Sequence, residues 1–268
     1  MTTDYRPISR ERHAHKKWLA PRDMRFAAHR HIVPIVNAEI GHAARALPLS
    51  FVKIGNATTL VAVLGLTPGR NLLVSENGRW LGVYKPALLR SHPFRLAKTD
   101  ADKFVLCVDE TSGLVIESAI GETGSPFFDE QGQIAPGTTK MMDFVSTLQQ
   151  AEQATAGAVR AIEAAGLLEP WPIKTGEGAS ATQVQGLLRI NEAALNALDP
   201  TALHQLRQSG GLAISYAQLI SVGNLQMLST VLVASQKAEA KRMTVPEKSF
   251  LSEDDGSLKI DWSTFLKS

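Results

Sequence analysis

The chain has 268 residues, 44% of them hydrophobic and 20% charged, which excludes a disordered or fibrous protein. A chain of this length buries roughly 70% of its unfolded surface, so it needs no disulfide or metal for stability. Its 28 basic residues nearly balance 26 acidic ones, which excludes the strong positive field of a dedicated nucleic-acid binder.

Residues 1–30 are basic, contain several histidines and are only weakly periodic, so we expect an arm that packs late or stays mobile. The chain starts without the apolar run of a secretory signal. Its single cysteine, Cys107, excludes an internal disulfide and a thiolate zinc cluster and fits a reducing compartment. Together these features predict a cytoplasmic protein.

Residues 31–136 are predicted to be β-rich because short apolar runs alternate with turn residues. The Asn77-Gly78 pair, between two such runs, is a hairpin signal because both residues tolerate a positive φ. The runs lie at 32–36, 50–54, 59–66, 71–74, 80–83 and 103–108, and the other turn pairs are Gly55-Asn56 and Pro68-Gly69.

Residues 137–242 are predicted to be mainly helical. Apolar residues spaced by three and four favour one long amphipathic helix over 137–166, and a small hairpin is predicted from strands at 171–174 and 184–190. Residues 31–242 should then form a single α+β domain, with the helical half packed against the β-rich half, and 243–268 a tail. Asn191 is expected to cap the start of a helix at 192–198. Asp199-Pro200 should begin the next helix, which ends at Gly210-Gly211, and Pro246 should terminate a last helix at 212–242.

No charged residue occurs between Arg207 and Lys237, a stretch long enough to cross a bilayer. Its polar content, with Gln218, Asn224 and Gln226 among several hydroxyl side chains, disfavours a position in hydrocarbon. We therefore expect no integral membrane span. The helix at 212–234 is expected to pack in the core or against a second copy of the chain.

An ordered set of motifs extends over about residues 28–235 and resembles the SapC family. The resemblance implies an accessory role in a bacterial surface-layer or peptide transport system, and it supplies no catalytic residues. A permease would need several apolar spans, which this sequence lacks. The motifs are Val33-Pro34-Ile35-Val36 with Glu39, 47–52, 64–66, Asn71-Leu72, Gly78-Arg79-Trp80, 84–94, 107–110, 127–132, 211–219 and 223–226.

Two His-x-His pairs lie in the amino-terminal region, His13-Ala14-His15 and His29-Arg30-His31. On a strand, such spacing presents both imidazoles on one side, where they can share a metal. His29 and His31, completed by His42 or Glu39, are the candidate ligands of a metal-assisted enzyme acting on a peptide or protein. The alternative is that these histidines are solvated or bind the main chain.

Cys107 is a nucleophile only if a base such as His92 folds against it. The carboxylates of Asp109 and Glu110 would raise its pKa, so a small core residue is the favoured interpretation. Adjacent residues on a strand point to opposite faces. Asp109 and Glu110 are therefore expected to end a strand, with one of them open to a partner.

The segment 84–94 is the preferred candidate binding surface. Tyr84, Lys85, Arg90 and His92 can bind an anion or a peptide carboxylate, and two prolines constrain the segment. We expect them to meet Asp109 and Glu110 in one polar pocket. The alternative is scaffolding, in which Pro86 starts a short helix that ends at His92-Pro93.

Two functions follow from these patterns. The first is a soluble, non-enzymatic binding or accessory protein, linked to a bacterial peptide or surface-protein transport system, with a protein or peptide partner and no cofactor. The second is the metal-assisted enzyme. The sequence contains no Walker A loop, dinucleotide fingerprint or nucleophile elbow.

Overall fold

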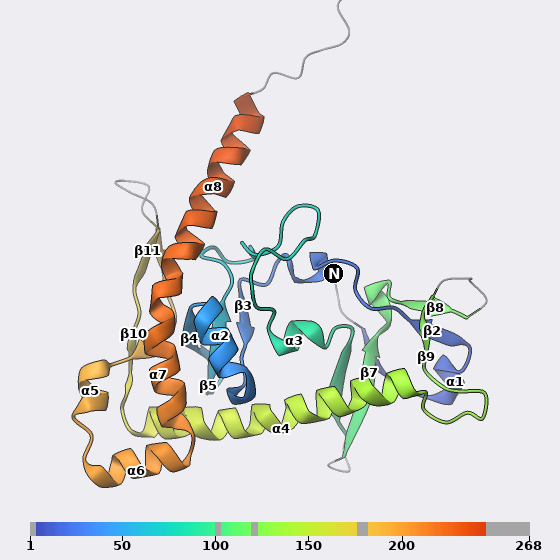
Figure 1. The fold of residues 1–268 in the computed structure, drawn as a ribbon, viewed down its shortest axis with the longest axis horizontal. Helices are drawn as coiled ribbons and strands as arrows, with labels where there is room; N and C mark the ends of the chain where they lie inside the picture. Colours follow the sequence, from blue (N-terminus) through green and yellow to red (C-terminus); the bar gives the residue numbers. More distant parts are fainter. Residues whose placement is uncertain (1–3, 100–102, 119–122, 176–181, 245–268) are drawn as a thin grey trace, which may run out of the picture. The chain divides into compact units, whose positions relative to one another are not determined.

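The computed structural model describes residues 4–99, 103–118, 123–175 and 182–244. The chain divides into two compact units, Met1–Leu232 and Val233–Ser268, and each is described by itself. The first unit holds the sheets and most of the helices, and α8 (Leu225–Thr244) continues into the second (Figure 1). The predicted tail lies outside the described residues from 245 onward.

The largest sheet is antiparallel and has the strand order β10-β13-β4-β5-β3. The predicted runs at 32–36, 50–54 and 59–66 supply three of its strands, and Gly55 takes the positive φ of +59° in the hairpin turn between two of them. The strands are β3 (Ile32–Pro34), β4 (Leu49–Ile54), β5 (Ala57–Val63), β10 (Leu168–Pro170) and β13 (Leu187–Ile190). The predicted small hairpin forms between β11 (Ile173–Thr175) and β12 (Thr182–Val184).

The amino-terminal residues differ from the predicted arm. β1 (Tyr5–Pro7) extends a sheet of β7 (Phe104–Asp109) and β6 (Phe94–Lys98), and β2 (Lys16–Trp18) lies between β8 (Val115–Glu117) and β9 (Ser125–Pro126). The Trp18 ring packs edge-on against Phe94 at 4.9 Å and donates from Nε1 to Thr138. Three-residue strands are too short to show a period of two, which is why the sequence pattern missed them.

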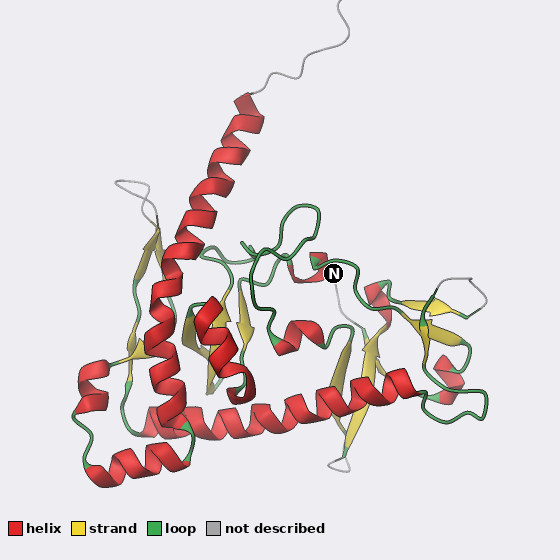
Figure 2. Ribbon diagram, viewed as in Figure 1, coloured by secondary structure: helices red, strands yellow, loops and turns green. Residues whose placement is uncertain are grey.

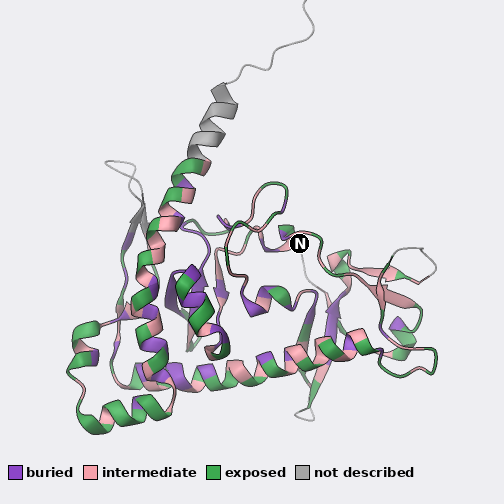
Figure 3. Ribbon diagram, in the orientation of Figure 1, coloured by how far each residue is buried: buried purple, intermediate pink, exposed green. Residues whose placement is uncertain are grey.

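The long helix α4 (Pro136–Ala164) confirms the predicted one and runs along the antiparallel sheets (Figures 1 and 2). Its apolar side chains enter three separate hydrophobic clusters. Ala158, Val159 and Ile162 face the large sheet. Val145 packs against the sheet of β1, β7 and β6, and Leu148 packs near α3 (Ala87–Arg90). Buried positions, drawn purple, recur along α4 in Figure 3. The fold is therefore α+β, with helices mainly in the carboxy-terminal half.

The carboxy-terminal helices begin where the caps predict. Asn191 accepts from Ala194 N at the start of α5 (Glu192–Asn196), and Asp199 accepts from two amides of α6 (Pro200–Gln208). The predicted helix at 212–242 is observed as a continuous helical stretch over 211–244, whose α geometry is interrupted once, by a 3₁₀ turn at Val222–Asn224 between α7 (Gly211–Ser221) and α8. Asn224 Nδ2 donates to the carbonyls of Ala44 and Leu47, which directs this turn toward α2 (Ile40–Ala46).

The predicted hairpin at Asn77-Gly78 is reduced to a turn with a single bridge between Val74 and Trp80. Ser75 Oγ contacts Asn77 and the Arg79 carbonyl, and the Gly78 carbonyl accepts from Met24 N. The turn is thus held by local side-chain contacts and by Met24 from the amino-terminal region. By length and composition alone, Gly211–Ser235 qualifies as a candidate membrane span among the described residues.

Candidate functional site

The predicted 84–94 surface is built around a carboxylate that was not among its predicted members. Glu39 is 5% exposed and ends the 3₁₀ turn Asn37–Glu39. Its carboxylate accepts hydrogen bonds from the amides of Val36 (3.2 Å) and Ala87 (2.7 Å) and from the Tyr84 hydroxyl (2.6 Å). Burial, with the Glu39 contact second, raises the pKa of Tyr84 to about 12, so this phenol is a hydrogen-bond donor at neutral pH.

The cations of this surface lie at its outside. Arg90 is exposed at the end of α3, with its guanidinium carbon 5.4 Å from the centre of the Phe144 ring. Its charge acts on Tyr84 and lowers that pKa against the effect of Glu39. His42 stacks on the Tyr84 ring at 5.8 Å, and Lys85 is partly exposed beside it in sequence. Tyr84, Arg90 and Glu39 thus form one electrostatic group.

His92 belongs to a different group. Its ring stacks on Phe26 with centroids 4.0 Å apart. Burial lowers the pKa of His92 to about 4. The negative charge of Asp109 acts to raise this pKa, and the positive charge of Arg30 acts to lower it further. The imidazole is therefore neutral at physiological pH and is packed as an aromatic ring.

Asp109 ends β7 and supports the amino-terminal strand. It is 2% exposed, and its Oδ1 accepts from the amides of Asp4 and Thr111 and from the Thr111 hydroxyl (2.7 Å). Tyr5 lies opposite Asp109 in the strand register, with Arg95 over its ring at 3.8 Å. The pKa of Tyr5 is raised mainly by burial and, to a smaller extent, by the negative charge of Asp109.

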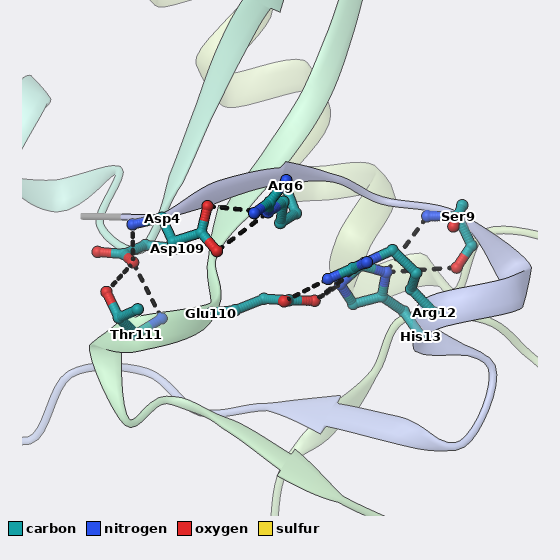
Figure 4. Close-up of polar contacts among 8 residues, drawn as sticks. All are labelled: Asp4, Arg6, Ser9, Arg12, His13, Asp109, Glu110 and Thr111. Carbon is teal, nitrogen blue, oxygen red and sulfur yellow. Dashed lines mark hydrogen bonds and ion pairs between the residues drawn. The ribbon is translucent and has the colours of Figure 1, made fainter. Parts of the chain in front are cut away.

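Glu110 turns away from Asp109, as expected for adjacent residues at a strand end, and points toward α1 (Arg10–His13) (Figure 4). It pairs with Arg12 at 2.7 Å, and this contact lowers the Glu110 pKa. Its other oxygen lies 3.2 Å from Nε2 of His13, a fully buried side chain whose Nε2 has no partner of hydrogen-bond geometry. Burial lowers the pKa of His13, which leaves this imidazole neutral beside the carboxylate.

The six predicted binding residues therefore do not form one group. Electrostatic effects connect Tyr84 with Arg90, and His92 with Asp109, while Glu110 belongs to the Arg12–His13 contact. The partners that complete these groups, Glu39, Tyr5 and Phe26, were missed. Only Glu39 left a local signal, because it stands three residues after Val36 where a turn begins.

The predicted metal ligands contact the main chain instead. Nδ1 of His29 lies 3.2 Å from the Gly69 carbonyl, and Nδ1 of His31 accepts from the Gly69 amide at 3.2 Å. Across the described parts of the chain, no group of three His, Cys, Asp or Glu side chains is placed to hold a metal ion. The two histidines together support the loop of Gly69.

Cys107 is buried, with 2% of its surface exposed, and burial raises the pKa of its thiol. It lies opposite Pro7 on β1 and Arg95 on β6. A raised pKa lowers the thiolate fraction at neutral pH. These properties fit a small core side chain.

The fold and these contacts define a class: a mixed α+β protein of antiparallel sheets and one long helix, in which polar side chains connect the amino-terminal segment and loops to the sheets. The SapC family model matches residues 8–228, so the chain belongs to the SapC family. No curated protein and no solved structure matches it.

Proposed function

We propose that this SapC-family protein is a non-enzymatic, cytoplasmic binding protein that serves a bacterial peptide or surface-protein transport system. Its partner is a protein or peptide segment in which a carboxylate stands next to an apolar side chain. The binding site is the Tyr84 surface, defined as Leu81, Val83, Tyr84, Lys85 and Arg90. The link to transport rests on the family resemblance, and the buried free thiol of Cys107 supports the compartment.

The observation that carries the proposal is an exposed apolar segment on a fixed base. Val83 is 93% exposed and Leu81 is 44% exposed. The chain around them is held by Trp80 Nε1, which donates to the Tyr84 carbonyl at 3.1 Å, and by the Tyr84–Glu39 contact. A rigid segment loses little conformational entropy when a partner covers it, so its exposed apolar side chains favour binding.

The charges of the surface specify the partner. Lys85 and Arg90 supply two cations, and the guanidinium of Arg90 can form charge-assisted hydrogen bonds with a carboxylate. Four groups that were candidates for chemistry hold the fold together instead: Glu39 and Asp109 each accept from several donors, and His29 and His31 contact Gly69. This supports binding over catalysis.

Site-specific photocrosslinking in the native cell tests the proposal. A photoreactive residue replacing Val83 should capture one protein, and the same replacement at Ile54, an exposed apolar residue of β4, should not. The captured protein is then purified and titrated. Val83→Asp and Arg90→Glu should each weaken its binding at least tenfold while Ile54→Asp leaves it unchanged. Equal binding by all three variants would remove the Tyr84 surface as the site.

A further inference from the structure

The helix α7 buries three polar side chains and exposes two large apolar ones, while its apolar Ile214 also lies in the core. Ser215, Gln218 and Ser221 are each 0% exposed, whereas Tyr216 is 48% and Ile220 is 72% exposed. A surface helix of a monomeric protein normally shows the reverse distribution. The outer face of α7 therefore has the composition of a buried surface.

The inner polar residues fix the rotation of α7 about its axis. Gln218 Oε1 accepts from Ile190 N at 2.9 Å and its Nε2 donates to the Leu49 carbonyl at 3.2 Å, so it connects β13 with β4. Ser221 Oγ accepts from Leu49 N at 2.9 Å. Turning the helix to bury Tyr216 and Ile220 would leave these main-chain groups unpaired in the core, at a substantial cost. The outer face is thus a preformed surface.

That face consists of Ala213, Tyr216, Ile220 and Gly223, which are all exposed and follow one another at spacings of three, four and three. No charged side chain interrupts the sequence from 208 to 236. The pattern is small, large, large, small, and it is symmetric about position 218. We call these four residues the outer face of α7, although the last of them, Gly223, lies in the 3₁₀ turn that follows the helix.

We propose that the outer face of α7 pairs with the same face of a second copy of this chain, in an antiparallel two-fold contact centred near Gln218. In this register Tyr216 lies against Ile220 of the partner subunit, and Ala213 lies against the partner's Gly223. The small residues at both ends let the two helices approach closely. A two-fold contact needs a surface that complements itself, and this symmetric, uncharged pattern does so.

The dimensions favour a second helix over a lipid surface. The helical stretch Gly211–Ser235 is long and apolar enough to be a candidate membrane span, but the outer face of α7 occupies only its first part. From Ala213 to Gly223 this face is about 15 Å long at 1.5 Å per residue, roughly half the thickness of a bilayer core. It lacks the Lys and Arg residues with which interfacial helices bind lipid headgroups, and exposed Gln226 and Thr230 follow it on α8. Because four residues from each subunit are far fewer than the roughly 20–30 of a standard interface, we expect a dissociation constant of about 1–100 µM.

Analytical ultracentrifugation of the full chain from about 1 to 300 µM tests the proposal, over the range that brackets this affinity. The wild-type chain should pass from monomer to dimer. Ile220→Asp should weaken self-association at least tenfold, because it places a carboxylate in the uncharged contact. Ile54→Asp, which adds the same charge at an exposed apolar position of β4, should dimerise as the wild type does.

Mixed variants test the register. Tyr216→Lys and Ile220→Glu should each dimerise poorly alone, and their mixture should dimerise more strongly, because the new cation faces the new anion. A chain that stays monomeric at 300 µM, a dimer that Ile220→Asp does not weaken, or a mixture without gain would each overturn the proposal. So would binding to phosphatidylcholine vesicles that requires Ile220 in a chain without self-association.

Discussion

The Tyr84 hydroxyl donates to Oε2 of Glu39 across 2.6 Å, although the two residues are 45 positions apart in the chain. The same carboxylate oxygen accepts from Ala87 N, and the other oxygen accepts from Val36 N. One buried side chain therefore connects the turn before α2 with the loop before α3. The proposed binding surface is rigid because Glu39 lies beneath it.

Replacing Tyr84 with Phe should destabilise the protein by about 1–2 kcal/mol, because Glu39 then keeps its burial and loses its shortest hydrogen bond. Urea unfolding followed by circular dichroism measures the change. Tyr216→Phe is the matched control, measured below about 1 µM, where the proposed contact between two copies is dissociated. The Tyr216 side chain is then 48% exposed, so the change should alter the free energy of unfolding by less than about 0.5 kcal/mol. Equal effects of the two variants would contradict the role given to Glu39.

The start of α7 requires a glycine. A Cβ at Gly211 would lie 2.6 Å from Leu206 Cδ1 and 3.2 Å from the Ala158 carbonyl oxygen. Gly211→Ala should therefore cost about 1–3 kcal/mol of stability through overpacking. Gly41→Ala, in α2 with no heavy atom within 4 Å of the new Cβ, should instead be neutral or stabilising by up to about 1 kcal/mol. Chemical denaturation of both variants checks the difference, and a neutral Gly211→Ala would show that α4 and α6 do not approach α7 this closely.

The amino-terminal strand protects Cys107. Pro7 lies opposite Cys107 in the register of β1 and β7, and only 2% of the cysteine is exposed. A chain lacking residues 1–14 should react with a thiol reagent at least tenfold faster than the full chain. The rate for the unfolded chain in denaturant, where the thiol is fully exposed, gives the upper limit. If both chains react equally slowly, Cys107 is covered by other parts of the protein.

Local patterns predicted the elements whose stabilising contacts are close in sequence. Asn191 and Asp199 cap their helices within three residues, and the β4–β5 hairpin turns at Gly55. The 29-residue α4 carries enough turns for its period to be clear. In each case the signal, whether a cap, a turn glycine or a repeating apolar face, lies within the window in which the pattern is read.

The remaining features depend on distant partners. β1 forms because it adds to the edge of β7, about one hundred residues away, and Tyr5–Pro7 alone carries no strand signal. The 3₁₀ turn inside the helix predicted at 212–242 lies where Asn224 bonds to carbonyls about 180 residues earlier. The predicted polar pocket fails for the same reason: Tyr84 turns to Glu39, His92 to Phe26 and Glu110 to Arg12. Sequence spacing does not show which of several polar partners a side chain will meet.

Acid should destabilise the protein partly through His92. The folded-state pKa of about 4 lies below the ordinary value near 6.5 of the unfolded chain. The native state therefore disfavours protonation, so the stabilisation is fully present above about pH 6.5 and is lost as the pH falls toward 4. His92 is partly exposed, and after allowance for solvent screening we expect a loss of about 1–2 kcal/mol between pH 7.5 and 4.5.

His92→Gln removes this titration while keeping a neutral polar side chain beside Phe26. Urea unfolding at pH 7.5 and 4.5 should show a smaller loss of stability for the variant than for the wild type. His13, whose pKa burial also lowers, contributes a loss of the same sign to both proteins, so the difference between them reports His92 alone. Parallel losses in the two proteins would mean that protonation of His92 does not disturb its stacking on Phe26, and the acid sensitivity would then belong to His13 and other groups.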